Sequence, residues 1–209
     1  EKWGEQVHAI IRLVDDHFVD EASIIAHCHD WIANYKCPRS VEFVIDPLPL
    51  SEHDKKHLDS LGKLSHIFIT NSDHIRNTES LAKETGATIW APEAEQENFT
   101  IECSNWLGEQ QNILDGLDSY SLQGSKTDGE LAFVIEGNTL LTGDLIRAHA
   151  GGKLCILPEP KLQDKTLASE SVKRLASIKG IHAVLPGDGW PIFRNGAKVL
   201  SELVSSLSH

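Results

Sequence analysis

The segment LSHIFITNSDHIR, residues 64–76, joins an apolar run directly to a polar cluster. The apolar run predicts a buried strand, and the polar cluster comes just before a helical pattern. Because α/β proteins usually place their chemistry at the carboxyl ends of buried strands, the polar turn is the first candidate site. The simpler alternative is a loop that caps the next helix, with Asn71, Ser72 or Asp73 as the N-cap residue.

Strands and helices alternate on both sides of this segment. A capping box at Ser51 predicts a helix that ends at Gly62, and the helix after the polar turn is expected to end at Gly86. Residues 5–14 and the apolar runs at 41–45 and 87–91 predict strands, and the strand at 41–45 is expected to end at Asp46-Pro47, where proline stops the ladder. A strand, helix, strand order with short connections is typical of an α/β fold.

The second half of the chain is richer in strands. The predicted strands are Ile113–Leu114, Ser119–Leu122, Leu131–Glu136, Thr139–Thr142 and 181–185, with Gly137-Asn138 as a hairpin turn. A helix is predicted over 164–180, and a final helix carries Leu200 and Val204 on one face. Without an internal repeat or a long linker, a single domain spanning residues 1–209 is expected.

The polar turn resembles the first metal motif of the metallo-β-lactamase fold superfamily, Thr-His-x-His-x-Asp-His. With Thr70 on the motif's threonine, the positions align as follows: Asn71 and Asp73 stand on histidines, Ile75 on the aspartate and Arg76 on the last histidine. A register shifted by two residues would place His74 on the last histidine. It would also put the first histidine inside the strand, so the unshifted register is preferred.

Three later stretches resemble the remaining motifs of that superfamily, in the same order along the chain. Residues 124–130, GSKTDGE, resemble its Gly-His-Thr-Pro-Gly turn, with Ser125 in place of the histidine. Residues 140–144, LLTGD, resemble the stretch whose aspartate bridges two metals, and Asp144 keeps that aspartate. Residues 186–189, PGDG, resemble the Gly-His-Gly turn, with Asp188 substituted. The resemblance covers roughly residues 41–207.

The resemblance implies an α/β fold of the αββα sandwich type. Two mixed β-sheets are expected to pack face to face, with helices on both outer sides and the four turns meeting along one edge. It also implies a metal-dependent hydrolase, but the ligand histidines are replaced in this chain. A zinc site needs about four nitrogen, sulfur or carboxylate ligands, so a tight dinuclear zinc centre is not expected. The remaining Asp73, Asp144 and Asp188 suit a weakly bound hard cation such as Mg²⁺, Mn²⁺ or Ca²⁺, or no metal.

Two functions remain open for such a chain. In the first, it is an active hydrolase of an ester, thioester or phosphoester, with Asp73 as a ligand or general base and His74 as a proton shuttle. In the second, it is a binding or structural protein, with a possible small-molecule ligand, that kept the fold after losing the metals. Both place the same residues around the cleft, namely Asn71, Asp73, His74, Arg76, Ser125, Asp144 and Asp188.

Arg76 distinguishes these hypotheses, because a guanidinium beside a cation site would repel a metal. The preferred register predicts that its guanidinium points at Asp144 or Asp188 and replaces the charge of the lost metal. In the alternative, Arg76 begins the helix with its side chain in solvent, where it contributes almost nothing to stability.

The composition of the chain bears on its binding partners and its location in the cell. The 209 residues carry 19 basic and 31 acidic side chains, a net charge of −12, which argues against nucleic acid. No apolar run is long enough to span a membrane, and residues 1–4, EKWG, lack the apolar centre of a signal peptide, so neither a membrane span nor secretion is expected. The four scattered cysteines suit free thiols in a reducing compartment, so a cytoplasmic location is expected.

The segment 15–40 contains a second group of potential ligands. His27 and His29 alternate, so on a strand they would point the same way and could share one metal. The simpler interpretation is that Cys28 is a buried thiol and that the two histidines bind nothing, since no third ligand stands at a recognisable spacing.

Overall fold

The structure is a computed structural model that describes residues 43–207. The strand predicted at 5–14 and the His27-Cys28-His29 segment lie outside these residues. Within the described part, Cys103 and Cys155 are free thiols, as expected. None of the helices in that part is long and apolar enough to cross a membrane.

The first sheet consists of four parallel strands, paired in the order of the chain. They are β1 (Phe43–Ile45), β2 (His66–Phe68), β3 (Thr88–Pro92) and β4 (Asn105–Leu107). The connections contain α2 (Glu52–Leu61), η2 (Ser72–His74), α3 (Thr78–Thr85) and η3 (Glu93–Asn98). Ser51 forms the predicted capping box at the start of α2, and Gly86 ends α3 in a left-handed conformation at φ 74°.

The second sheet has five strands in the order β11-β8-β7-β6-β5, with β11 parallel to β8 and the other pairs antiparallel. These strands are β5 (Gln110–Leu114), β6 (Leu117–Ser121), β7 (Leu131–Ile135), β8 (Thr139–Thr142) and β11 (Ala183–Pro186). The turn between β7 and β8 uses Glu136 and Gly137, both at positive φ, one residue earlier than predicted.

A two-stranded antiparallel hairpin, which was not predicted from the sequence, follows β8. Its strands are β9 (Ile146–Ala150) and β10 (Lys153–Ile156). The remaining elements are η4 (Glu159–Lys161), α4 (Lys165–Ala176) and α5 (Gly196–Ser206). Asp164 caps α4 by accepting hydrogen bonds from the amides of Thr166 and Leu167.

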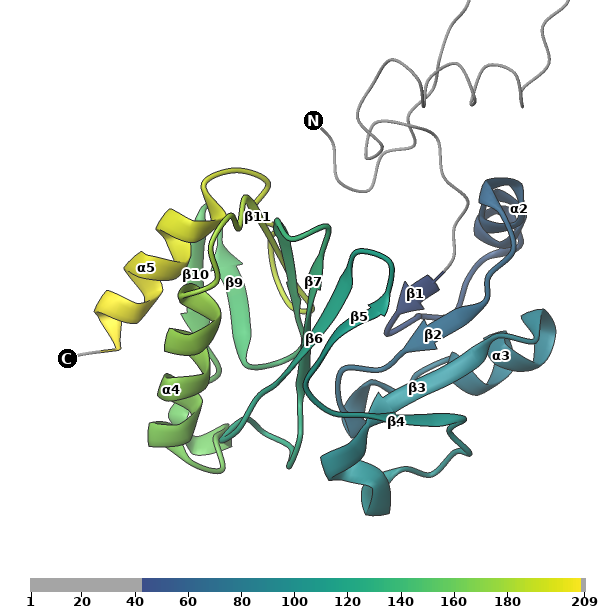
Figure 1. Cartoon of the computed structure of the whole chain (residues 1–209), viewed down its shortest axis with the longest axis horizontal. Coiled ribbons are helices and arrows are strands. Elements are labelled where there is room, and N and C mark those ends of the chain that lie inside the picture. The colour runs from purple at the N-terminus through teal and green to yellow at the C-terminus, as the bar shows by residue number, and fades with distance from the viewer. Residues whose placement is uncertain (1–42, 208–209) are drawn as a thin grey trace, which may run out of the picture.

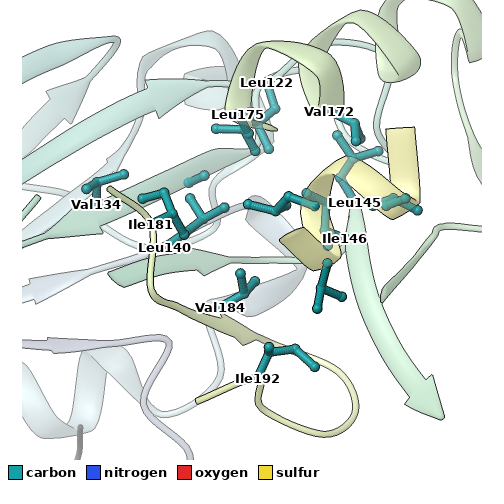
Figure 2. Packing of buried hydrophobic residues seen from close by; sticks show 14 of the residues in the cluster. Leu122, Val134, Leu140, Leu145, Ile146, Val172, Leu175, Ile181, Val184 and Ile192 are labelled. Carbon is teal, nitrogen blue, oxygen red and sulfur yellow. The ribbon is translucent and has the colours of Figure 1, made fainter. Parts of the chain in front are cut away.

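Three hydrophobic clusters define four layers, as the predicted αββα sandwich requires. Phe68 and Phe133 belong to the cluster between the two sheets, and Ile67 and Leu81 to the cluster between the first sheet and its helices. The largest cluster fills the space between the second sheet and α4 and α5 (Figure 2). Figure 1 shows α4 and α5 on one outer side of the sheets and α2 and α3 on the opposite side. The predicted fold class is confirmed.

The carboxyl ends of the parallel strands meet along one edge of the sandwich. At this edge, the Leu131 amide donates to the Thr70 carbonyl over 2.7 Å and so joins the second sheet to the turn after β2. The Gly187 amide donates to the Thr142 carbonyl over 2.8 Å and joins the ends of β11 and β8. The turns after β1, β2, β8 and β11 are therefore held beside one another.

Phe68 is the aromatic centre of the interface between the sheets. It is fully buried, and its ring centroid lies 5.4 Å from that of Phe133, 5.7 Å from Trp90 and 5.6 Å from Phe43. We expect Phe68→Ala to lower the free energy of unfolding by about 3–5 kcal/mol, because it leaves a cavity among these rings. Urea unfolding measures the loss. Leu48→Ala is the control, since Leu48 is 60% exposed, and equal stability of the two variants would contradict this view of the core.

Candidate functional site

Asp46, Thr70 and His74 form a buried hydrogen-bond group where β1 and β2 end. The Asp46 carboxylate accepts from the Thr70 amide over 2.8 Å and from the Thr70 hydroxyl over 2.6 Å. His74 Nδ1 lies 2.8 Å from the same carboxylate, and the histidine side chain is 8% exposed. Asp46 thus fixes both the turn after β2 and the orientation of the imidazole ring.

His74 connects this group to the second sheet. Its Nε2 atom lies 3.6 Å from the Asp144 carboxylate, which follows β8. Burial alone would lower the pKa of His74, but its pairing with Asp144 and Asp46 outweighs burial and raises the pKa to about 9. The same pairing holds the pKa of Asp144 below its usual value. The site therefore contains an imidazolium between two carboxylates near neutral pH.

Two further ion pairs lie at the rim of the same edge. The Lys126 ammonium contacts the Asp73 carboxylate, and the Arg147 guanidinium contacts the Asp188 carboxylate. His149 Nε2 lies 3.8 Å from the same Asp188 oxygen. The positive charges of Lys126 and Arg147 also help to hold the pKa of Asp144 down, so these pairs face one electrostatic centre.

Two fully buried glutamates hold the surrounding loops together. The Glu95 carboxylate accepts hydrogen bonds from the Ser72 amide over 2.7 Å and from the Thr127 hydroxyl over 2.7 Å. Glu130 accepts from the Ser125 hydroxyl over 2.6 Å and from the Leu145 amide over 3.0 Å. Burial raises the pKa of Glu130 to about 7.

Gly143 lies between the side chains of Thr70, Asn71 and Glu130. A Cβ atom at this position would lie 2.8 Å from Thr70 Oγ1 and 3.1 Å from both Asn71 Nδ2 and Glu130 Oε1. A side chain at position 143 would therefore force the buried side chains of Thr70, Asn71 and Glu130 to shift.

The residues predicted for the site reach one edge of the sandwich, in different roles. Asn71 is the N-cap of η2 and accepts a hydrogen bond from the Asp73 amide over 3.0 Å, as the simpler alternative for this turn proposed. Ser125 is fully buried against Glu130. His74 and Asp144 form the centre, while Asp73 and Asp188 lie at the rim, each in its own ion pair.

The prediction that Arg76 pairs with Asp144 or Asp188 is wrong. Arg76 stands at φ 44°, and its guanidinium donates to the Asp46 carbonyl over 3.1 Å. Within residues 43–207 it makes no ion pair, and Arg147 takes the place at Asp188. The left-handed backbone turns the arginine toward the end of β1 and away from those carboxylates.

The residues that the structure describes do not fit a metal centre. No group of three or more His, Cys, Asp or Glu side chains in the described part is placed to hold a metal ion. Asp73, Asp144 and Asp188, the ligands expected for a weak cation, are each paired with a different cationic side chain. A divalent ion at any of them would meet an ammonium, a guanidinium or an imidazolium at short range.

A sequence model of the metallo-beta-lactamase superfamily matches residues 18–207, and the chain therefore belongs to this superfamily. Membership makes it hydrolase-like by family. One curated relative, the medium-chain acyl-CoA ligase Mig of Mycobacterium avium, is 38% identical over 56 residues. That match spans 26% of this chain and 10% of the ligase, too little to support an argument about activity.

Solved structures of the superfamily share the fold. FIM-1 from Pseudomonas aeruginosa, in a mono-zinc form, is 12% identical with a TM-score of 0.62 over 81% of this chain and 80% of its own. TTHA1623, in a di-iron-bound form, is 16% identical, with a TM-score of 0.60 over 76% of this chain and 86% of its own. ETHE1 from Myxococcus xanthus is 19% identical, with a TM-score of 0.54 over 80% of this chain and 79% of its own. At these identities the likeness concerns the fold alone.

His74 should make the stability of the protein depend on pH. Its pKa rises from 6.5 to about 9 on folding, so its contribution is complete below pH 6.5 and is lost as the pH rises through 9. We expect the difference in unfolding free energy between the parent and His74→Gln to shrink over this range by on the order of 1–3 kcal/mol. Urea unfolding across the range measures it. His53→Gln, at an exposed position on α2, is the control, and a pH-independent difference for His74→Gln would contradict the imidazolium bridge.

Proposed function

We propose that this chain is a metal-independent binding protein built on the metallo-β-lactamase fold, with a small molecule as its ligand, and not a dinuclear-metal hydrolase. The observation that supports this proposal is that each carboxylate at the strand ends is paired with a cationic side chain. His74 pairs with Asp46 and Asp144, Lys126 pairs with Asp73, and Arg147 pairs with Asp188.

The electrostatics favour this arrangement over metal binding. Carboxylates gathered without cations raise one another's pKa values and so create a site for a metal ion. Here the attraction to His74, Lys126 and Arg147 holds the pKa of Asp144 down, so three cations already compensate much of the negative charge that would recruit a metal. Metal binding would have to displace these side chains, which offsets much of what the new bonds contribute.

The competing function is hydrolysis of an ester, thioester or phosphoester by a hard cation on Asp73, Asp144 and Asp188. One observation favours it: the side chains of Asp73 and Asp188 are 45% and 38% exposed, so a hydrated ion can reach them. The two functions differ in what Lys126 and Arg147 do, because the first needs both cations in place and the second needs both displaced.

Removing these two cations tests the proposal. We expect the parent protein, after dialysis against a chelator, to hold substoichiometric metal and to show no rise in melting temperature with Mn²⁺. In Lys126→Met/Arg147→Met the freed carboxylates should bind Mn²⁺, so that the ion raises the melting temperature of this variant alone. Calorimetry, elemental analysis and hydrolysis assays with ester, thioester and phosphoester substrates give the readouts.

Lys153→Met/Arg194→Met is the matched control. Both residues are exposed and make no ion pair within the described residues, so the control loses the same charge without freeing a carboxylate. Mn²⁺ should leave the melting temperature of this control variant unchanged. A parent protein that is stabilised by Mn²⁺ and hydrolyses one of the substrates, with both effects lost in Asp144→Asn, would establish the competing function.

A further inference from the structure

Arg76 has an arrangement that the site at the strand ends does not explain. Arg76 is exposed, and within the described residues its guanidinium makes one hydrogen bond, to the Asp46 carbonyl. Both Arg76 and Asp46 stand in the left-handed region, at φ 44° and 48°, although neither is glycine. Backbone strain of this kind costs free energy and concentrates at ligand sites, where the surrounding structure maintains it.

The two strained residues border a cavity of about 150 Å³ at the seam between the sheets. Its walls are mostly apolar and come from both sides of the seam, with Ile45 from β1, Leu141 from β8, and Leu185 and Pro186 from β11. The negative charge of the Asp46 carboxylate is partly offset by the His74 imidazolium, Thr70 also donates hydrogen bonds to it, and its side chain is 9% exposed. The cavity therefore combines apolar walls with one guanidinium.

We propose that this cavity binds a short aliphatic monocarboxylate, whose carboxylate pairs with Arg76 and whose alkyl chain packs against Leu141 and Leu185. This inference rests on the proposed binding function and names the class of its ligand. A guanidinium presents a planar fork of donors that matches a carboxylate, and the donors of Arg76 beyond its one bond to Asp46 are available for it.

The size of the cavity limits the alkyl chain. A water molecule takes up about 30 Å³ of liquid, so the space corresponds to roughly five waters. Butyrate matches that space, acetate leaves most of the apolar wall uncovered, and octanoate exceeds it. Binding should therefore strengthen from acetate to butyrate and gain nothing further with octanoate, since only buried alkyl groups contribute.

Titration of the parent protein with butyrate, followed by NMR of its backbone amides in a chelator-containing buffer, tests the proposal. We expect a dissociation constant on the order of 1 mM, as a ligand of this size allows, with the amides of Arg76 and Gly187 among those that shift. Butyramide, which has the same shape without the charge, should bind at least about tenfold more weakly.

Three variants complete the experiment. Arg76→Gln should weaken butyrate binding at least about tenfold by removing the charge, and Leu185→Trp should do the same by filling the cavity. Arg194→Gln, which removes an exposed arginine after β11, should bind as the parent does. Equal binding of butyrate and butyramide, or full binding by either cavity variant, would overturn the proposal. If Arg76→Gln folds poorly, Leu185→Trp decides the matter.

The two proposals fail separately. Absence of butyrate binding would overturn the carboxylate site and leave the metal measurements on Lys126→Met/Arg147→Met unchanged. Stabilisation of the parent by Mn²⁺ would overturn the metal-independent function, whatever butyrate does in the presence of chelator.

Discussion

Charge compensation at one edge of the sandwich is the constraint on which the arrangement of this protein depends. Parallel strands end side by side, and their turns bring Asp46, Asp73, Asp144 and Asp188 to the same region. Negative charges this close are costly unless cations pair with them. In the interior, His74 meets this need by lying between two carboxylates from different sheets. At the rim, where Asp73 and Asp188 are more exposed than Asp46 and Asp144, Lys126 and Arg147 supply the compensating charges.

The loops around the site keep their shape without a shared metal, because buried carboxylates hold them. Glu95 accepts from the turn after β2 and from the loop before β7, and Glu130 links that loop to the turn that carries Asp144. Their donors are uncharged amides and hydroxyls, so these contacts add no cation to the edge. The loops around the site are thus held by interactions other than the ion pairs.

Local signals in the sequence were enough to predict the fold. A capping box, helix-ending glycines and apolar runs located the helices and most strands, and four motifs in the right order identified the sandwich. The same motifs placed His74 and Asp144 at one edge. They failed for Arg76, because a motif fixes the position of a residue along the chain and not the direction of its side chain, which follows from its left-handed backbone.

Among the residues of the site that were not predicted, three were missed for different reasons. Asp46 was interpreted with the following proline as the end of a strand, and its role depends on contacts with a turn far along the chain. Lys126 stands beside Ser125 in a turn whose serine was the residue compared with a known motif. Arg147 lies on β9, and the Gly151-Gly152 pair between two short runs was the signal that would have predicted this hairpin.

The crowding around Gly143 has a consequence for how this chain can change over evolutionary time. Thr70, Asn71 and Glu130 already occupy the space that a side chain at 143 would need. A larger residue at 71, such as a histidine, would press on the same space, so its effect depends on which residues stand at 70, 130 and 143. Substitutions at these four positions are therefore epistatic, and their effects on stability cannot be added one by one. The order in which such changes arise decides whether each intermediate sequence still folds.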